Sequence, residues 1–97
     1  MPFYVTLYKL TDQGIKNIKG SPKRIEEGIR SLETMGGKVH GFYALLGEYD
    51  YISIAEAPND EIGMIFNIGL SSQGNVRTTT LKAFTTAEFT EMVKKLT

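Results

Sequence analysis

Two kinds of hydrophobic spacing alternate along the chain, and each change of spacing marks a boundary between a predicted strand and a predicted helix. Residues 3–9 are rich in β-branched and aromatic side chains, which predicts a first strand. Apolar residues from Ile25 to Met35 then recur at steps of three and four, as on one side of an amphipathic helix. Ser21 followed by Pro22 predicts the start of this helix, because serine can cap the first turn and proline fits the first helical position.

The rest of the chain predicts a hairpin, a second long helix, another strand and a terminal helix. Pro58 ends the hairpin, and Thr85 with Glu88 three residues later predicts a capping box for the terminal helix. The predicted ranges are residues 38–46 and 49–57 for the hairpin strands, Asn59 or Asp60 to about Ser71 for the helix, residues 76–84 for the strand, and through Lys95 for the terminal helix. We expect the terminal helix to bury its apolar side chains, which are Phe89, Met92, Val93 and Leu96.

The predicted order of elements is strand, helix, strand, strand, helix, strand, followed by the terminal helix. Two split βαβ units in this order form a ferredoxin-like α+β fold, in which both main helices cover one face of an antiparallel four-stranded sheet. Right-handed crossovers place the first and third strands in the centre. We therefore expect one domain over residues 1–97, with the second face of the sheet left uncovered by helices.

The alternation of side chains along each strand predicts what that uncovered face carries. One parity of the first strand is purely apolar, and we expect its members, Phe3, Val5 and Leu7, to pack under the helices. The uncovered face then carries Tyr4, Thr6 and Tyr8 from the first strand, His40, Phe42 and Ala44 from the second, and Tyr51, Ser53 and Ala55 from the third. The fourth strand adds either Arg77, Thr79 and Leu81 or, one register away, Val76, Thr78 and Thr80. Such an aromatic and hydroxyl-rich surface would suit a dimer interface that encloses a small cavity.

Composition narrows the function classes. Eleven basic and eleven acidic side chains give no net charge, which removes the electrostatic footprint of a nucleic-acid binder. The chain has no cysteine and one histidine, so disulfides, zinc thiolate sites and an iron triad are excluded, and we expect no metal and no cofactor. No apolar run approaches the roughly 20 residues of a membrane span, and the start of the chain lacks the basic region of a signal peptide. A chain this small gains much from an oligomeric interface, so we expect a soluble, cytoplasmic homo-oligomer.

The turn Gly47-Glu48-Tyr49-Asp50 carries more polar chemistry than a turn requires, since glycine and aspartate alone would suffice. Either its carboxylates are solvated, or the turn belongs to a site. The tyrosines of the chain also have two interpretations: they bury their rings at a subunit contact, or they line a pocket for an aromatic or quinone-like molecule. The candidate ligand-binding residues are Tyr4, Thr6, Tyr8, Phe42, Ser53, Glu48, Tyr49 and Asp50.

A catalytic interpretation requires three further candidates. His40 is either a hydrogen-bonded structural residue or a general base, because histidine can transfer protons near neutral pH. If it is a base, Tyr51 and Arg77 would stabilise the anion that develops on a small aromatic or quinone-like substrate. The corresponding enzyme would be a cofactor-independent oxygenase or isomerase.

Several segments together resemble the GYD domain family. They are residues 11–19, Ser21-Pro22-Lys23-Arg24, the turn Gly47-Glu48-Tyr49-Asp50, which resembles the motif that names the family, Glu56-Ala57-Pro58, and residues 74–78. The resemblance covers nearly the whole chain and implies a dimeric α+β barrel, in which two uncovered sheet faces pack together. It supplies no reaction. The predicted function is accordingly a homo-oligomeric small-molecule binding or accessory protein, with the enzyme and a purely structural assembly module as alternatives.

Overall fold

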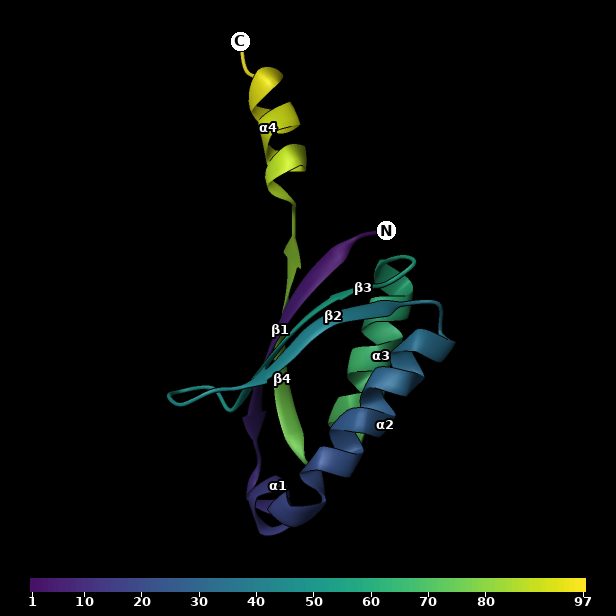
Figure 1. Cartoon of the computed structure of the whole chain (residues 1–97), viewed down its shortest axis with the longest axis vertical. Helices are drawn as coiled ribbons and strands as arrows, with labels where there is room; N and C mark the ends of the chain where they lie inside the picture. The colour runs from purple at the N-terminus through teal and green to yellow at the C-terminus, as the bar shows by residue number, and fades with distance from the viewer.

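The computed structural model describes all residues from Met1 to Thr97. Its elements are, in chain order, β1 (Phe3–Leu10), α1 (Asp12–Lys16), the 3-10 turn η1 (Ile18–Gly20), α2 (Ser21–Thr34), β2 (Lys38–Ala44), β3 (Tyr51–Glu56), α3 (Asp60–Ser72), β4 (Val76–Ala83) and α4 (Thr86–Lys94). The strands form one antiparallel sheet in the order β2-β3-β1-β4, and α2 and α3 cover one face of it (Figure 1). The predicted ferredoxin-like α+β fold, with β1 and β3 in the centre, is confirmed. No helix has the length and apolar character needed to cross a membrane.

Local capping chemistry sets where most of the helices begin. The Asn59 side chain accepts a hydrogen bond from a first-turn N–H of α3 at 2.9 Å. Thr85 and Glu88 form the predicted capping box at the start of α4. The prediction that Ser21 caps α2 is wrong: its hydroxyl donates to the Ile18 carbonyl at 2.7 Å, because η1 runs directly into the helix and leaves no free first turn to cap.

The two faces of the sheet are exchanged relative to the prediction for β1 and β3. Tyr8 and Tyr51 are buried under the helices, with only 7% and 9% of their surfaces exposed. Asn67 of α3 donates a hydrogen bond to the Thr80 hydroxyl of β4 at 2.6 Å, which identifies that side of the sheet as the helix side. The residues predicted for the uncovered face that instead face the helices are Tyr4, Thr6 and Tyr8 of β1, Tyr51, Ser53 and Ala55 of β3, and Phe42 and Ala44 of β2.

The reason for the exchange lies in how the polar groups are satisfied. Alternation correctly divided β1 and β3 into two sets each, but the purely apolar sets were expected to lie under the helices, and that rule failed here. The hydroxyl-bearing set is buried instead, because its members hydrogen-bond to one another and to α3. The aliphatic residues of β1 and β3, expected under the helices, lie on the opposite side.

We call that opposite side the open face, because no helix covers it (Figure 1). It carries Phe3, Val5 and Leu7 of β1, Ile52 and Ile54 of β3, Tyr43 of β2 and Leu81 of β4. Of the two registers considered for β4, the one that places Arg77, Thr79 and Leu81 on this face is correct. A register shift between Val39 and Gly41 keeps His40 on the open face, as predicted, while Phe42 turns towards the helices.

The terminal helix α4 continues from the end of β4 and projects away from the sheet and the other helices (Figure 1). The molecule is consequently long, with a longest dimension of 53 Å and a shortest of 19 Å. Phe89, Met92 and Val93 are 59%, 42% and 47% exposed, and Leu96 is 78% exposed. The predicted burial of these side chains is therefore wrong for a single chain, because no other element lies beside α4.

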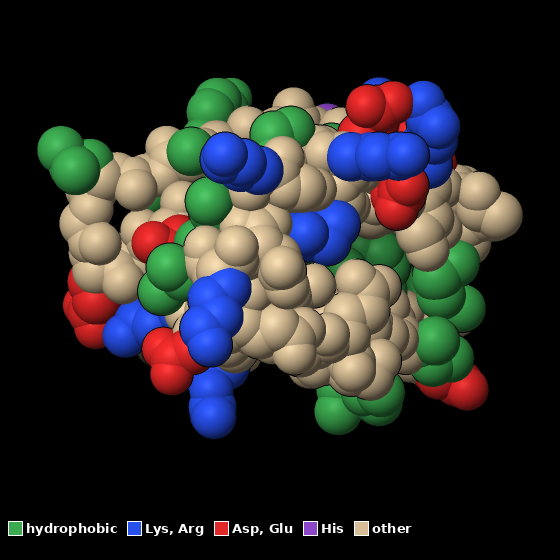
Figure 2. Space-filling view, turned by 90° about the horizontal axis from the view of Figure 1, so that it is seen from below, with side chains coloured by type: hydrophobic (Ala, Val, Ile, Leu, Met, Phe, Trp, Pro, Cys, Tyr) green, Lys and Arg blue, Asp and Glu red, His purple; other side chains and the backbone are tan.

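The opposite end of the molecule, formed by α1 and the start of α2, is charged. Figure 2 shows Lys and Arg side chains there with acidic side chains among them. Lys16, Lys19 and Arg24 line a shallow depression at this end, and the Arg24 guanidinium donates to the Asn17 carbonyl at 2.8 Å. Mixed charges of this kind form ordinary solvated surface, in contrast to the apolar open face.

Candidate functional site

A cavity of about 110 Å³ lies between the sheet and the helices α2 and α3. Its lining is mostly apolar, with contributions from Ile25 and Ile29 of α2 and from Phe66 and Leu70 of α3. Five of the candidate ligand-binding residues line this cavity, namely Tyr4, Thr6, Tyr8, Phe42 and Ser53, and the catalytic candidate Tyr51 lines it as well. The structure thus brings these residues together, but inside one chain and not on the open face.

An aromatic cluster forms one wall of the cavity. The ring centroids of Tyr8 and Phe42 are 5.5 Å apart, those of Phe42 and Tyr51 are 5.4 Å apart, and those of Tyr8 and Tyr51 meet edge-on at 6.4 Å. Such tilted and edge-on pairs are favourable beyond the area that they bury. Burial raises the pKa of the Tyr8 phenol, against the smaller lowering effect of its hydrogen bonds to Ser53 and Thr6. Tyr8 therefore stays neutral and acts as a hydrogen-bonding hydroxyl.

Hydroxyl groups under the helices form a chain of mutual contacts. The Tyr8 hydroxyl and the Ser53 Oγ are 2.9 Å apart, and the Thr6 and Thr80 hydroxyls are 3.2 Å apart. The Asn67 amide completes the set by donating to Thr80. Every buried side-chain nitrogen and oxygen has a hydrogen-bond partner within the chain. No fully buried polar side-chain atom is left unpaired to anchor a ligand, and the lining is mostly apolar, so the free volume favours a small apolar occupant.

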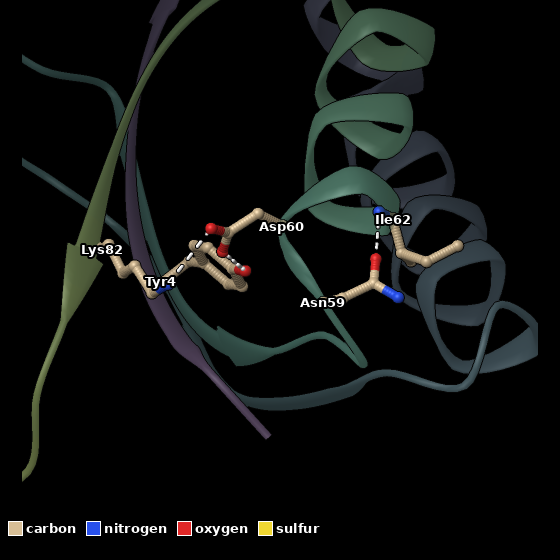
Figure 3. Close-up of polar contacts among 5 residues, drawn as sticks. All are labelled: Tyr4, Asn59, Asp60, Ile62 and Lys82. Atoms are coloured by element: carbon tan, nitrogen blue, oxygen red, sulfur yellow. Dashed lines mark hydrogen bonds and ion pairs between the residues drawn. The ribbon is translucent and has the colours of Figure 1, made fainter.

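A polar cluster joins β1, β4 and the start of α3 near the N-terminal end of that helix (Figure 3). The Tyr4 hydroxyl donates to Asp60 Oδ1 at 2.5 Å, and the Lys82 ammonium contacts Asp60 Oδ2 at 3.1 Å. Burial of the ring, the hydrogen bond to Asp60 and the negative charge of that carboxylate raise the pKa of Tyr4 to about 12. The hydrogen bonds from Tyr4 and Lys82 lower the pKa of the Asp60 carboxyl. The carboxylate of Asp60 is solvent-exposed, so this cluster orients α3 on the sheet without burying a charge.

The three catalytic candidates do not form one site. His40 lies on the edge strand β2 and Arg77 on the opposite edge strand β4, both on the open face, whereas Tyr51 lies under the helices. The His40 Nε2 is 2.7 Å from Glu56 Oε2, and its ring stacks on Phe3 with centroids 5.2 Å apart. The contacts with Glu56 and Phe3 are those of a hydrogen-bonded structural histidine on an edge strand, which is the first of the two interpretations of His40.

The turn Gly47-Glu48-Tyr49-Asp50 is tied to the end of β1. Asp50 Oδ2 accepts a hydrogen bond from the Leu10 N–H at 2.8 Å, and the Asp50 N–H donates to the Tyr8 carbonyl at the same distance. Glu48 lies 3.3 Å from the ammonium of Lys9, which also sits 5.2 Å above the Tyr49 ring. Gly47 has a φ of 146°, a conformation that favours glycine. The motif residues therefore hold the hairpin loop in place.

Sequence reasoning missed several residues that complete this arrangement. Asp60 and Lys82 were not singled out as site residues. An acidic residue in the first turn of a predicted helix could have drawn attention to Asp60, because a negative charge is favourable at the N-terminus of a helix. Asn67 was also missed. Its signal is a polar side chain among apolar neighbours on one helix, which indicates a buried partner.

An antiparallel sheet covered by helices on one side and open and apolar on the other defines the protein as a ferredoxin-like α+β protein with a face available for association. The GYD domain model matches residues 4–93, and the chain belongs to the GYD domain family. A relative from Thermus thermophilus, named "Glutamine synthetase and cystathionine beta-lyase binding protein", is 35% identical over 95 residues, which is 97% of this chain and 100% of the relative. The crystal structure of TTHA0845, also from Thermus thermophilus, covers 88% of this chain and 95% of its own, with a TM-score of 0.54 and 21% identity, and shows the same fold.

Proposed function

We propose that the chain is a cytoplasmic, homo-oligomeric binding protein that acts as an accessory to a metabolic enzyme, with glutamine synthetase and cystathionine β-lyase as the first candidates. The observation that carries the proposal is that the surface of the chain, and not its interior, offers groups for binding. The polar groups of the interior are satisfied within the chain, whereas large apolar side chains are exposed on the outside. The name of the relative, which covers nearly the same length, points to enzymes as partners.

Self-association is the role we assign to the open face. Tyr43, Ile54 and Leu81 are 58%, 36% and 52% exposed, and each belongs to a different strand of the same face. A contiguous apolar surface of this kind is uncommon on a monomeric protein and marks an interaction site. Because a small domain buries limited surface by itself, association with a second copy through this face would add the missing core.

The hairpin between β2 and β3 is our candidate for the contact with an enzyme. Leu46 at its tip is fully exposed and Leu45 is 39% exposed. The loop that carries them is fixed to β1 by Asp50. An apolar side chain on a rigid support loses little conformational entropy on binding, which is the property of an interface anchor.

Biolayer interferometry with glutamine synthetase and with cystathionine β-lyase from the same organism tests this proposal. We expect the chain to bind at least one of the two enzymes, and Leu46→Asp to weaken binding by about tenfold or more. Ser71→Asp, which adds the same charge at an exposed position of α3, is the matched control and should bind as the unaltered chain does. Absence of binding to both enzymes at concentrations of tens of micromolar, roughly the affinity of a weak complex, would contradict the proposal.

The cavity favours a second candidate function, the binding of a small apolar molecule. Its volume of about 110 Å³ is below the roughly 300 Å³ of a typical drug-sized site, so only a compact ligand would fit. Mass spectrometry of small molecules released from the purified protein tests this candidate. We expect a released compound to disappear when Ala55→Leu, at the buried wall of the cavity, fills part of the space. We propose no reaction, since His40, Arg77 and Tyr51 lie apart.

A further inference from the structure

The apolar side of α4 is, beside the open face, a second apolar surface that the chain leaves uncovered. We call it the α4 stripe, and it consists of Phe89, Met92 and Val93 together with Leu96 just beyond the end of the helix. These positions are three, four and seven residues apart from the first, so they share one side of the helix. All of them are exposed, with Leu96 at 78%. A helix with one uncovered apolar side requires a partner.

The helix itself is well specified by its sequence. The Thr85 and Glu88 capping box satisfies its first turn, and Lys94 pairs with Glu91 at 3.0 Å on its polar side. Short amphipathic helices are marginal in water unless their apolar side is packed. The local signals therefore determine that a helix forms, and an apolar surface outside the chain is needed to stabilise it.

The connection to β4 keeps the stripe away from the sheet of its own chain. Only Phe84 and Thr85 separate the end of β4 from the start of α4, and β4 is an edge strand. Figure 1 shows α4 continuing beyond the end of the sheet instead of folding back over it. Leu81 and Phe84, which are 52% and 54% exposed, connect the open face to the start of this projecting helix.

We propose that the α4 stripe of one copy packs against the open face of a second copy, and that the second copy returns the same contact. The proposal rests on the self-association stated above and specifies its geometry. A twofold arrangement buries both stripes and both open faces at once, in equal numbers, with no further partner. Each of the two surfaces is apolar and uncovered within its own chain, and each would cover the other.

The poor burial within one chain favours a second copy as the occupant. Only 9 of 97 residues are buried, and none of the large side chains is fully buried. A chain that leaves its own core incomplete is typical of a protomer that completes it by association. The absence of net charge removes electrostatic repulsion between two copies.

Sedimentation equilibrium of paired variants tests the contribution of α4. We expect Phe89→Asp with Val93→Asp to weaken self-association by about tenfold or more, because two charges enter an apolar contact. Ala87→Asp with Thr90→Asp adds the same charge on the polar side of the helix and should leave the association unchanged. If both variants self-associate as strongly as the unaltered chain, the docking of the α4 stripe is ruled out, whereas self-association itself stands. A chain that is monomeric throughout would remove both.

Paramagnetic broadening between two copies tests where the stripe docks. Because the chain has no cysteine, Thr90→Cys on the polar side of α4 accepts a single nitroxide label and leaves the stripe unaltered. Mixed with copies that lack the cysteine and carry isotopic methyl labels, the spin-labelled chain should broaden the methyl signals of Ile52 and Ile54 on the open face. Ile65 and Ile68, exposed on the outer side of α3, should stay sharp. Broadening on α3 alone, or none, overturns the proposal, as would a stripe variant that loses only the binding of an enzyme.

Discussion

Replacing Asp50 with alanine removes the carboxylate that accepts a hydrogen bond from the Leu10 N–H at 2.8 Å. Leu10 is the last residue of β1, and the pairing of β1 with β3 ends two residues earlier, at Tyr8 and Tyr51. The side chain of Asp50 thus takes the place of the next backbone acceptor along the ladder. Its loss leaves a partly buried N–H without that partner, and it also frees the hairpin loop.

The expected size of the effect follows from the charge and the burial of this hydrogen bond. A hydrogen bond to a charged group contributes about 1.5–3 kcal/mol, and partial exposure of the Asp50–Leu10 contact places it at the lower end, about 1.5 kcal/mol. For a domain of this size, such a loss lowers the melting temperature by about 7 °C. Asp50→Asn keeps an acceptor oxygen in the same position, so we expect it to lose less than half as much.

Urea unfolding of the two variants, together with hydrogen exchange of the Leu10 amide, measures both consequences. Asp50→Ala should lower the free energy of unfolding and speed exchange at Leu10, and Glu48→Gln at the exposed Lys9 contact serves as the control with a change of about 0.5 kcal/mol or less. If Asp50→Ala leaves both the stability and the exchange of that amide unchanged, the motif does not hold the loop as described. The enzyme-binding role of the hairpin tip would then lose its rigid support.

Three further predictions concern the core and the polar clusters. Thr80→Val removes the hydroxyl that the buried Thr6 and the half-buried Asn67 share and should lower the free energy of unfolding by about 1–3 kcal/mol, whereas Thr79→Val on the open face should have little effect in the same urea titration. Gly14→Ala would place a Cβ 2.1 Å from a backbone carbonyl oxygen and should be destabilising by about 2–3 kcal/mol, while Gly69→Ala, with no atom within 4 Å, should be neutral or stabilising. The raised pKa of Tyr4 means that its contribution to stability is fully present below pH 10 and is lost as the pH rises through about 12. In an ultraviolet titration, Tyr4 and Tyr8 should ionise later than the other tyrosines, and Tyr4→Phe should remove one of these two late phenols; ionisation of Tyr4 together with the other tyrosines would contradict this.

The order of elements could be predicted from the sequence because the signals for it are local. The Thr85 and Glu88 capping box and the cap at Asn59 each involve residues within one turn of helix, so their pattern is readable without knowledge of the fold. The grouping of Tyr4, Thr6 and Tyr8 on one face was equally predictable, since alternation alone decides it. That is why most of the predicted ligand-binding set does line one cavity.

The side of the sheet on which that set lies could not be read in the same way. The aliphatic residues of β1 are the obvious choice for a core, and only contacts with distant positions reverse it: Tyr4 with Asp60 of α3, and Thr6 with Thr80 of β4. The prediction that α4 buries its apolar side chains failed for a related reason. A stripe of apolar residues indicates that a helix is covered, but it does not say whether its own chain covers it.

The irregularity of β2 between Val39 and Gly41 has a consequence for how copies of this protein meet. β2 is an outer strand, and a regular outer strand displays a row of free N–H and C=O groups to which a foreign strand can add. The extra residue interrupts that row and increases the local twist. Addition of a strand from another molecule is therefore unfavourable at this edge of the sheet. The exposed apolar surfaces can then serve a closed oligomer without the sheet also extending into fibres through β2.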